Sequence, residues 1–185
     1  SADVGFATLW TTAYTLARYN KCFAKFYLTQ DYEPLFYPAG SISAVIEQTY
    51  RLGFAFLANT PGVAKRVADH SAFGMYFVPG VEKSVFYPER RKVKTEGPYR
   101  IVFYGRPKNE RNCFMLGIEG LRMIKSRLKG QVEIISVGFD YPPGRYDLQG
   151  VLKVPGLLKS MEEVSSIYRS SDLGISFMTT PHPSY

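Results

Sequence analysis

The chain has 185 residues, of which 45% are hydrophobic. This is enough for one large domain or two small ones, and it argues against a disordered protein. The 23 basic and 16 acidic residues give a net charge of +7, which favours an anionic partner without choosing among nucleotide, nucleic acid and lipid headgroup. Cys22 and Cys113 lie far apart without metal-type spacing, so no metal site is expected. No apolar run approaches the roughly 18 residues of a membrane span, and no signal-peptide pattern opens the chain, which predicts a cytoplasmic protein.

Apolar runs alternate with amphipathic segments along the first half of the chain. Strands are predicted at residues 4–9, 22–28, 54–58 and 75–78, and helices at residues 11–19, 41–52 and 63–70. In the last of these helices, Lys65, Arg66 and His70 are expected to face solvent. This alternation is typical of a parallel sheet with helices on both of its faces.

A polar basic run at residues 87–94, YPERRKVK, has no periodicity and resembles a linker. We therefore place a domain boundary there, with one domain at residues 1–92 and another at residues 93–185. After the boundary, strands are predicted at residues 101–104, 132–137, 151–154 and 173–178. Helices are predicted at residues 112–129 and 160–170, the second opened by a capping box of Ser160 and Glu163.

The fold class predicted from these elements is α/β, with two Rossmann-like parallel-sheet domains. The chain opens directly on a strand and closes on a loop after a strand, so both domains are expected to be incomplete. An open sheet without its covering helices exposes apolar surface and unpaired edges. We therefore expect a fragment of a longer chain, or one that associates with a partner or with another copy through its incomplete sheets.

Residues 100–114, RIVFYGRPKNERNCF, have the composition of an anion site. An apolar strand ends at Gly105, and Arg106, Lys108 and Arg111 precede a predicted helix. A glycine permits a close backbone turn, and the first turn of a helix presents unpaired N–H groups. Three cations at such a position favour phosphate as the ligand.

Asp31 and Glu33 follow the second predicted strand of the first half. Ligands of open α/β sheets bind in the crevice beyond the carboxyl ends of the strands, so these carboxylates are candidates for chemistry. Either one can orient or deprotonate a substrate hydroxyl. The alternative is structural: Asp31 caps the turn and Glu33 is a surface residue before Pro34.

Several motifs resemble those of nucleotide-sugar glycosyltransferases of the GT-B type, and most closely the family-4-like rhamnosyltransferases known as rhamnan synthesis protein F. The resemblance covers most of the chain. The motifs that carry it are TQDYEPLFYP at residues 29–38, VPGV at 78–81, YP at 87–88, FYGRP at 103–107, SSDLG at 170–174 and PHPSY at 181–185.

This resemblance implies that the first domain holds the acceptor and the second holds the nucleotide-sugar donor. The implied partners are therefore a nucleoside-diphosphate sugar and a glycan or polysaccharide acceptor, with no metal or other cofactor. In this family a basic residue after the first strand of the donor domain, and another five positions later, contact the diphosphate. Arg106 and Arg111 hold those positions here, whereas Lys108 is expected to be solvated.

By the same resemblance, further donor-binding residues come from loops that follow the strands. They are Gly105, Gly138, Gly156, Leu157, His182, Ser184 and Tyr185. The loop at residues 154–158 is expected to hold the base, and an ordinary turn is the alternative for Gly156. The last loop departs from the paired-glutamate pattern of many relatives, because Pro181 and His182 stand where the first glutamate is expected.

Two other classes compete with the transferase hypothesis. A non-catalytic, Rossmann-like nucleotide-binding module is the main alternative, although no Gly-x-Gly-x-x-Gly follows a predicted strand. A nucleic-acid or membrane-surface protein is the other, drawn from the net charge. The basic residues are scattered over helix faces and the linker, so nucleic acid is not expected, and loose contact with the inner membrane face stays compatible with a transferase.

Overall fold

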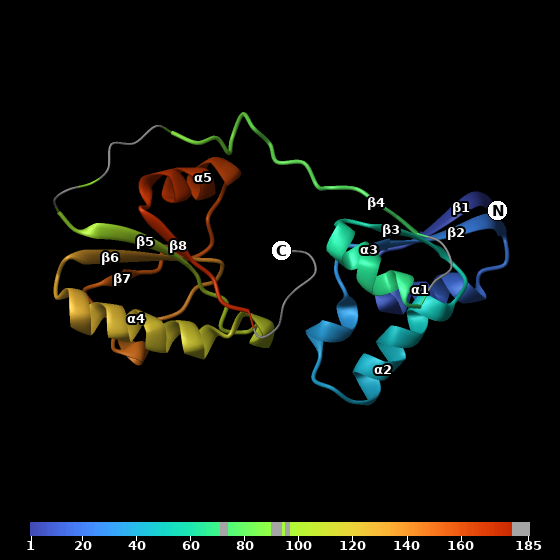
Figure 1. Ribbon diagram of the computed structural model, residues 1–185, viewed down its shortest axis with the longest axis horizontal. Helices are drawn as coiled ribbons and strands as arrows, with labels where there is room; N and C mark the ends of the chain where they lie inside the picture. Colours follow the sequence, from blue (N-terminus) through green and yellow to red (C-terminus); the bar gives the residue numbers. More distant parts are fainter. Residues whose placement is uncertain (71–73, 90–93, 95–96, 179–185) are drawn as a thin grey trace. The chain divides into compact units, whose positions relative to one another are not determined.

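The computed structural model describes residues 1–70, 74–89, 94 and 97–178. The chain forms two compact units (Figure 1), one holding Ser1–Gly80 and the other beginning at Val81. The division lies earlier in the chain than the boundary drawn from the sequence at 92/93. Residues 81–89 pack with the second unit because their backbone and side chains contact its last helix, as described below.

The first unit contains a four-stranded parallel sheet with the order β1-β2-β3-β4. Its elements are β1 (Ala2–Ala7), α1 (Trp10–Arg18), β2 (Cys22–Thr29), the 3₁₀ turn η1 (Glu33–Phe36), α2 (Ser41–Gln48), the 3₁₀ turn η2 (Thr49–Arg51), β3 (Ala55–Ala58), α3 (Pro61–Ala68) and β4 (Gly74–Tyr76). Gly53 ends the α2–η2 segment at a φ of 78°, a backbone conformation that glycine adopts readily.

The second unit contains another four-stranded parallel sheet, with the order β7-β6-β5-β8. Its elements are β5 (Tyr99–Tyr104), η3 (Glu110–Asn112), α4 (Phe114–Leu128), β6 (Val132–Val137), η4 (Pro143–Tyr146), β7 (Leu152–Lys153), α5 (Met161–Ser170) and β8 (Leu173–Ile175). Two α/β units with parallel sheets confirm the predicted Rossmann-like fold class.

The two sheets differ in how their faces are covered. In the first unit, α1, α2 and α3 lie on one side of the sheet (Figure 1), and the core there includes Tyr27, Phe56 and Val63. In the second unit, α4 and α5 lie on opposite sides of the sheet. Three consecutive residues of β5, Ile101, Val102 and Phe103, are accordingly buried, which requires cover on both faces.

Local sequence sets the helix starts. Thr60 caps α3 through a hydrogen bond from the Val63 N–H (3.1 Å). Ser160 caps α5 by accepting from the Glu163 N–H (3.2 Å), as predicted. The second half of the predicted capping box is shifted by one residue, because the Glu163 carboxylate accepts from the Lys159 N–H (2.9 Å).

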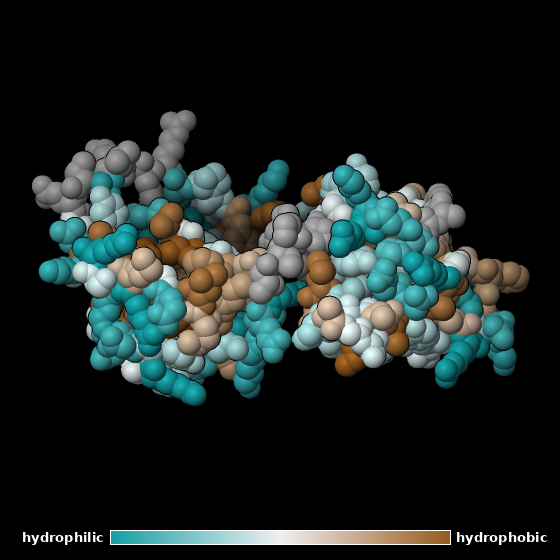
Figure 2. All heavy atoms as spheres, turned by 60° about the horizontal axis from the view of Figure 1, so that its bottom comes forward, coloured by the Kyte–Doolittle hydropathy of each residue, from teal (hydrophilic) through white to brown (hydrophobic). Residues whose placement is uncertain are grey.

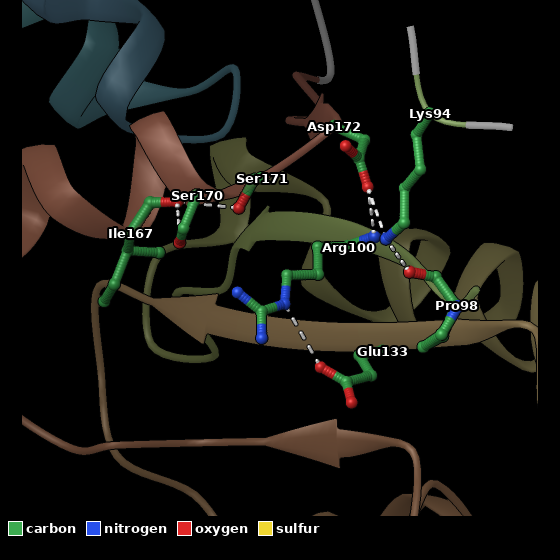
Figure 3. A network of polar contacts seen from close by, with 8 residues as sticks. All are labelled: Lys94, Pro98, Arg100, Glu133, Ile167, Ser170, Ser171 and Asp172. Atoms are coloured by element: carbon green, nitrogen blue, oxygen red, sulfur yellow. Dashed lines mark hydrogen bonds and ion pairs between the residues drawn. The ribbon is translucent and has the colours of Figure 1, made fainter. Parts of the chain in front are cut away.

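The amino ends of β5, β6 and β8 are joined by charged side chains (Figure 3). Asp172 accepts a hydrogen bond from the Arg100 N–H (2.8 Å) and also lies 3.5 Å from the Lys94 ammonium group. The Arg100 side chain in turn pairs with Glu133 on β6 (3.3 Å). The SSDLG motif therefore fixes the start of β8 against β5. This contact lies at the amino ends of the strands, whereas ligands are expected at their carboxyl ends.

Candidate functional site

The turn after β5 requires a glycine. The Gly105 N–H donates to the Val137 carbonyl of β6 (2.8 Å). A Cβ atom at this position would collide with the Ser136 hydroxyl and lie 2.8 Å from the Tyr141 hydroxyl. Gly138, at a φ of 117°, is also close to this turn, because its Cβ would lie 3.1 Å from the Gly105 carbonyl oxygen. The loops after β5 and β6 thus meet through two glycines, and they pack this closely only because neither residue carries a side chain.

Ser136 and Tyr141 lie directly beneath this turn. Both are buried, and the Tyr141 hydroxyl donates to Ser136 Oγ (2.7 Å). Burial raises the pKa of Tyr141 to about 12, so the phenol stays protonated at neutral pH. We did not predict either residue from the sequence, since a lone serine in a strand and a tyrosine after it carry no motif.

Arg106 extends from the same turn and is half-buried. Its Nη1 donates to the Tyr104 hydroxyl (3.2 Å), and the guanidinium carbon lies 5.9 Å from the centre of that ring. Within the described part of the chain, no carboxylate forms an ion pair with Arg106. Lys108 instead lies over the Phe139 ring at 4.9 Å. A guanidinium that is held by an aromatic side chain and keeps most of its donors can bind an anion bidentately.

Helix α4 begins without a side-chain cap. Cys113 occupies the N-cap position in the left-handed region, at a φ of 45°, and Phe114 opens a helix of 15 residues. Arg111 immediately precedes this start within η3. The first-turn N–H groups and the positive end of the helix dipole favour an anion at this position. The predicted strand, glycine turn and basic helix start are therefore present together.

Asn112 is a further residue at this helix start that the sequence did not single out. It is 3% exposed, and its Nδ2 donates to the Met178 sulfur (3.4 Å). No described residue hydrogen-bonds to its Oδ1. A buried amide between the basic turn and α4 fixes the path of the backbone that leads into the helix.

The remaining predicted donor residues follow β7 or lie at the chain end. Gly156 has a φ of 78°, and a Cβ there would lie 4.0 Å from the Asp140 carboxyl carbon, so the loops after β7 and β6 are neighbours. Leu157 is 90% exposed beside it. His182, Ser184 and Tyr185 lie outside the described residues. The structure thus brings Gly105, Arg106 and Gly138 together, with Gly156 beside the adjoining loop.

In the first unit, both candidate carboxylates after β2 are buried. Glu33 is 3% exposed and accepts a hydrogen bond from the Trp10 N–H at the start of α1 (2.8 Å). Burial raises its pKa above the usual value for a glutamate. The alternative of a surface Glu33 is therefore wrong, because the side chain satisfies the first turn of a helix. Asp31 is 7% exposed and accepts from the Tyr32 N–H (2.7 Å), which agrees with the structural alternative of a turn cap.

His70, two residues after the end of α3, does not face solvent as predicted, whereas Lys65 and Arg66 on α3 are exposed. The His70 ring stacks on Tyr32 and Tyr50, with ring centres 6.2 Å and 5.9 Å away. Its Nε2 lies 3.1 Å from the Tyr32 hydroxyl and 3.5 Å from the Glu47 carboxylate. Helical periodicity alone could not show this, because the partners come from the loop after β2 and from the end of α2.

The described residues contain no group of three or more His, Cys, Asp and Glu side chains that could hold a metal ion. None of the described helices has the length and apolar character needed to cross a bilayer.

The fold and the carboxyl edge of the β5–β8 sheet define a Rossmann-like α/β protein with a candidate anion site. Residues 99–185 match the family described as the C-terminal domain of WsaF. The chain is also 41% identical, over 186 aligned residues that cover all of it, to the O-antigen biosynthesis protein RfbC of Myxococcus xanthus. It spans 14% of the length of that relative. These matches support the resemblance to rhamnan synthesis protein F drawn from the motifs, over residues 99–185 for the family and over the whole chain for the relative.

Proposed function

We propose that the chain is part of a glycosyltransferase of polysaccharide biosynthesis, in which the second unit binds a nucleoside-diphosphate sugar. The observation that carries the proposal is the meeting of Gly105, Gly138 and Arg106 beside the uncapped start of α4. The match to the WsaF domain and the likeness to an O-antigen biosynthesis protein support it. Because the chain spans 14% of that relative, transfer is assigned to the whole protein and donor binding to this chain.

In the proposed reaction, a sugar moves from the nucleoside diphosphate to a hydroxyl of a growing glycan. Negative charge develops on the departing diphosphate as the glycosidic bond to it breaks. Arg106 and Arg111 neutralise this charge, together with the N–H groups of the first turn of α4. Rhamnose is the proposed sugar, by the family resemblance. No metal is required by this arrangement of cations.

Asp31 and Glu33 are the proposed contacts to the acceptor hydroxyl. The raised pKa of Glu33 makes its carboxylate the stronger base, and its bond to Trp10 fixes one of its oxygens. Replacing Asp31 by Asn and Glu33 by Gln in the whole protein separates the two roles. The variant that replaces the base is expected to lose glycosyl transfer while it still binds the donor.

The test of donor binding is calorimetric titration of this chain with dTDP, UDP, NAD and a short oligonucleotide. We expect one of the nucleoside diphosphates to bind, and Arg106→Ala and Arg111→Ala each to weaken it about tenfold or more, as the loss of a charge-assisted hydrogen bond implies. Arg127→Ala is the matched control, since Arg127 is an exposed cation in the last turn of α4. Binding of NAD or the oligonucleotide alone contradicts the proposal, as does unchanged affinity in both arginine variants.

A further inference from the structure

Residues 81–89 fold back onto α5 through a compact polar contact. The Val85 carbonyl accepts hydrogen bonds from the Ser165 hydroxyl (2.6 Å) and from Arg169 Nη1 (3.0 Å). Arg169 also donates to Ser165 Oγ (2.6 Å), and its Nε lies 2.9 Å from a Glu89 carboxylate oxygen. The guanidinium carbon stands 4.4 Å from the centre of the Tyr87 ring. Four interactions therefore join this segment to the helix, and the bond between Arg169 and Ser165 orders the two helix side chains that make them.

A pocket of about 390 Å³ lies between the segment and the helix, away from the loops that form the candidate donor site. Its lining residues are Phe86, Tyr87, Pro88, Glu89, Ser165, Tyr168, Arg169 and Ser171. Concave sites with aromatic walls and a few fixed polar groups are where small ligands bind in proteins. The volume is within the range of such sites.

The polar groups of the pocket select the kind of ligand. Arg169 makes the contacts above through Nη1 and Nε, and the Glu89 carboxylate is half-exposed, so a donor group and an acceptor group lie side by side at the pocket. Since the two side chains neutralise each other, the pocket offers no net charge to a phosphate. A donor and an acceptor held side by side match neighbouring hydroxyl groups, each of which both donates and accepts.

The aromatic groups complete the match. Tyr87 and Tyr168 are each 45% exposed, which leaves part of their ring surface available to a ligand. A pyranose presents hydroxyls around its rim and an apolar face of C–H groups, and an amphipathic tyrosine can contact both. We propose that this pocket binds a saccharide unit of the glycan on which the protein acts, a proposal that rests on the proposed function for the identity of that glycan.

The test is NMR titration of the ¹⁵N-labelled chain with methyl α-L-rhamnopyranoside and with a rhamnose disaccharide. We expect saturable shifts of the amides at residues 85–87, 89 and 165–171, with a Kd on the order of 1 mM. Glycerol is the comparison, as a polyol without a ring. Absence of shifts up to about 50 mM, or equal shifts with glycerol, overturns the proposal.

Variants locate the binding. Tyr168→Ala is expected to weaken disaccharide binding about tenfold, because an exposed aromatic contact is lost, while Tyr168→Phe keeps affinity within about twofold. Glu89→Gln, at a half-exposed side chain, weakens binding about threefold by replacing an acceptor with an amide. Tyr99→Ala is the matched control, since Tyr99 is 46% exposed but lies on β5 outside the pocket. Equal affinity of Tyr168→Ala and Tyr99→Ala contradicts the proposal.

Titration of the same variants with dTDP and UDP separates the two proposals. The pocket variants are expected to bind the nucleoside diphosphate normally, because the pocket shares no residue with the site at Arg106. Saccharide shifts without any nucleotide binding would support the pocket and contradict the transferase. Nucleotide binding without saccharide shifts would support the donor site and contradict the saccharide pocket.

Discussion

The two sheets of this protein have the same number of strands and the same parallel pairing, yet they are packed differently. In the first, buried and half-buried residues alternate along β3 and the second half of β2, because helices lie on one face. In the second, β5 is buried on consecutive residues between α4 and α5. Side chains on the two faces of the first sheet therefore differ in their surroundings, whereas those of β5 do not.

The less covered face of the first sheet is entirely apolar. We call it the open face, and it comprises Val4, Phe6, Ala24, Phe26, Leu28, Ala55, Leu57 and Met75. No described helix packs on it, and Phe6 and Met75 are more than half exposed. Hydrophobic side chains also interrupt the hydrophilic surface of both units in the view of Figure 2. Apolar residues on both faces of a strand therefore predict a parallel sheet correctly. They do not show whether a helix covers each face of that sheet.

The largest expected difference in the free energy of unfolding is between alanine variants of two phenylalanines on central strands. Phe103 is fully buried against α4, and Phe103→Ala is expected to lower the free energy of unfolding by about 3–5 kcal/mol. Phe26 lies on the open face, stacked on Phe6 with ring centres 5.3 Å apart, and Phe26→Ala is expected to cost about 1 kcal/mol. Urea unfolding measures both values. Equal losses would show that the open face is covered in solution.

A second test concerns how closely α4 approaches its sheet. A Cβ at Gly117 would lie 2.5 Å from Phe103 Cζ, so Gly117→Ala is expected to destabilise the protein by about 1–3 kcal/mol. The matched change is Gly120→Ala, whose Cβ would meet Phe177 at an ordinary 3.6 Å. That variant is expected to gain up to about 1 kcal/mol from helix propensity. Thermal unfolding distinguishes them, and a stable Gly117→Ala would contradict the close packing of the second sheet.

A third test uses the pH dependence of stability, because the carboxyl pKa shifts of the two units have opposite directions. Burial raises the pKa of Glu33 in the first unit, whereas the resolved carboxyl shifts in the second unit, at Glu82 and Glu162, are downward. A raised pKa means that the folded state binds the proton more tightly. The Glu33 contribution to stability is therefore fully present below its unfolded pKa and is lost as pH rises through its folded pKa.

Glu33→Gln removes this dependence while keeping an oxygen for the Trp10 N–H. We expect the variant to match the parent in Tm near pH 4 and to exceed it modestly at pH 7. Glu162→Gln, at an exposed position of α5 where the pKa is lowered, is the comparison and should change the difference between the two pH values in the opposite direction, with a slightly lower Tm than the parent at pH 7. A larger Tm gain for Glu33→Gln at pH 4 than at pH 7 would show that the sign is wrong.

The smallest effect on stability is expected on the open face itself. Phe6→Ser should change the free energy of unfolding by less than about 1 kcal/mol, since the side chain is 59% exposed. It should nevertheless lower the fluorescence of a bound hydrophobic dye, because it interrupts a continuous apolar surface. Met123→Ser is the control, at a residue that is 53% exposed on α4. Equal dye binding by the two variants would contradict a continuous open face.

The sequence by itself determined the local elements and part of the candidate site. Alternating apolar runs and helical periodicity predicted both parallel sheets, because each signal lies within one segment of the chain. Gly105, Arg106 and the start of α4 were predicted together for the same reason. Asp31 as a turn cap and Ser160 as a helix cap likewise depend only on neighbouring residues.

Tertiary structure alone decided the features that join distant segments. In the folded chain, Glu33 is buried against the start of α1 and His70 packs against Tyr32. Ser136 and Tyr141 lie beneath Gly105. Tertiary structure also joined residues 81–89 to α5, 80 residues later along the chain at Val85 and Ser165. Burial and hydrogen bonding at these positions depend on partners that periodicity within one segment does not specify, which is why the sequence could not show them.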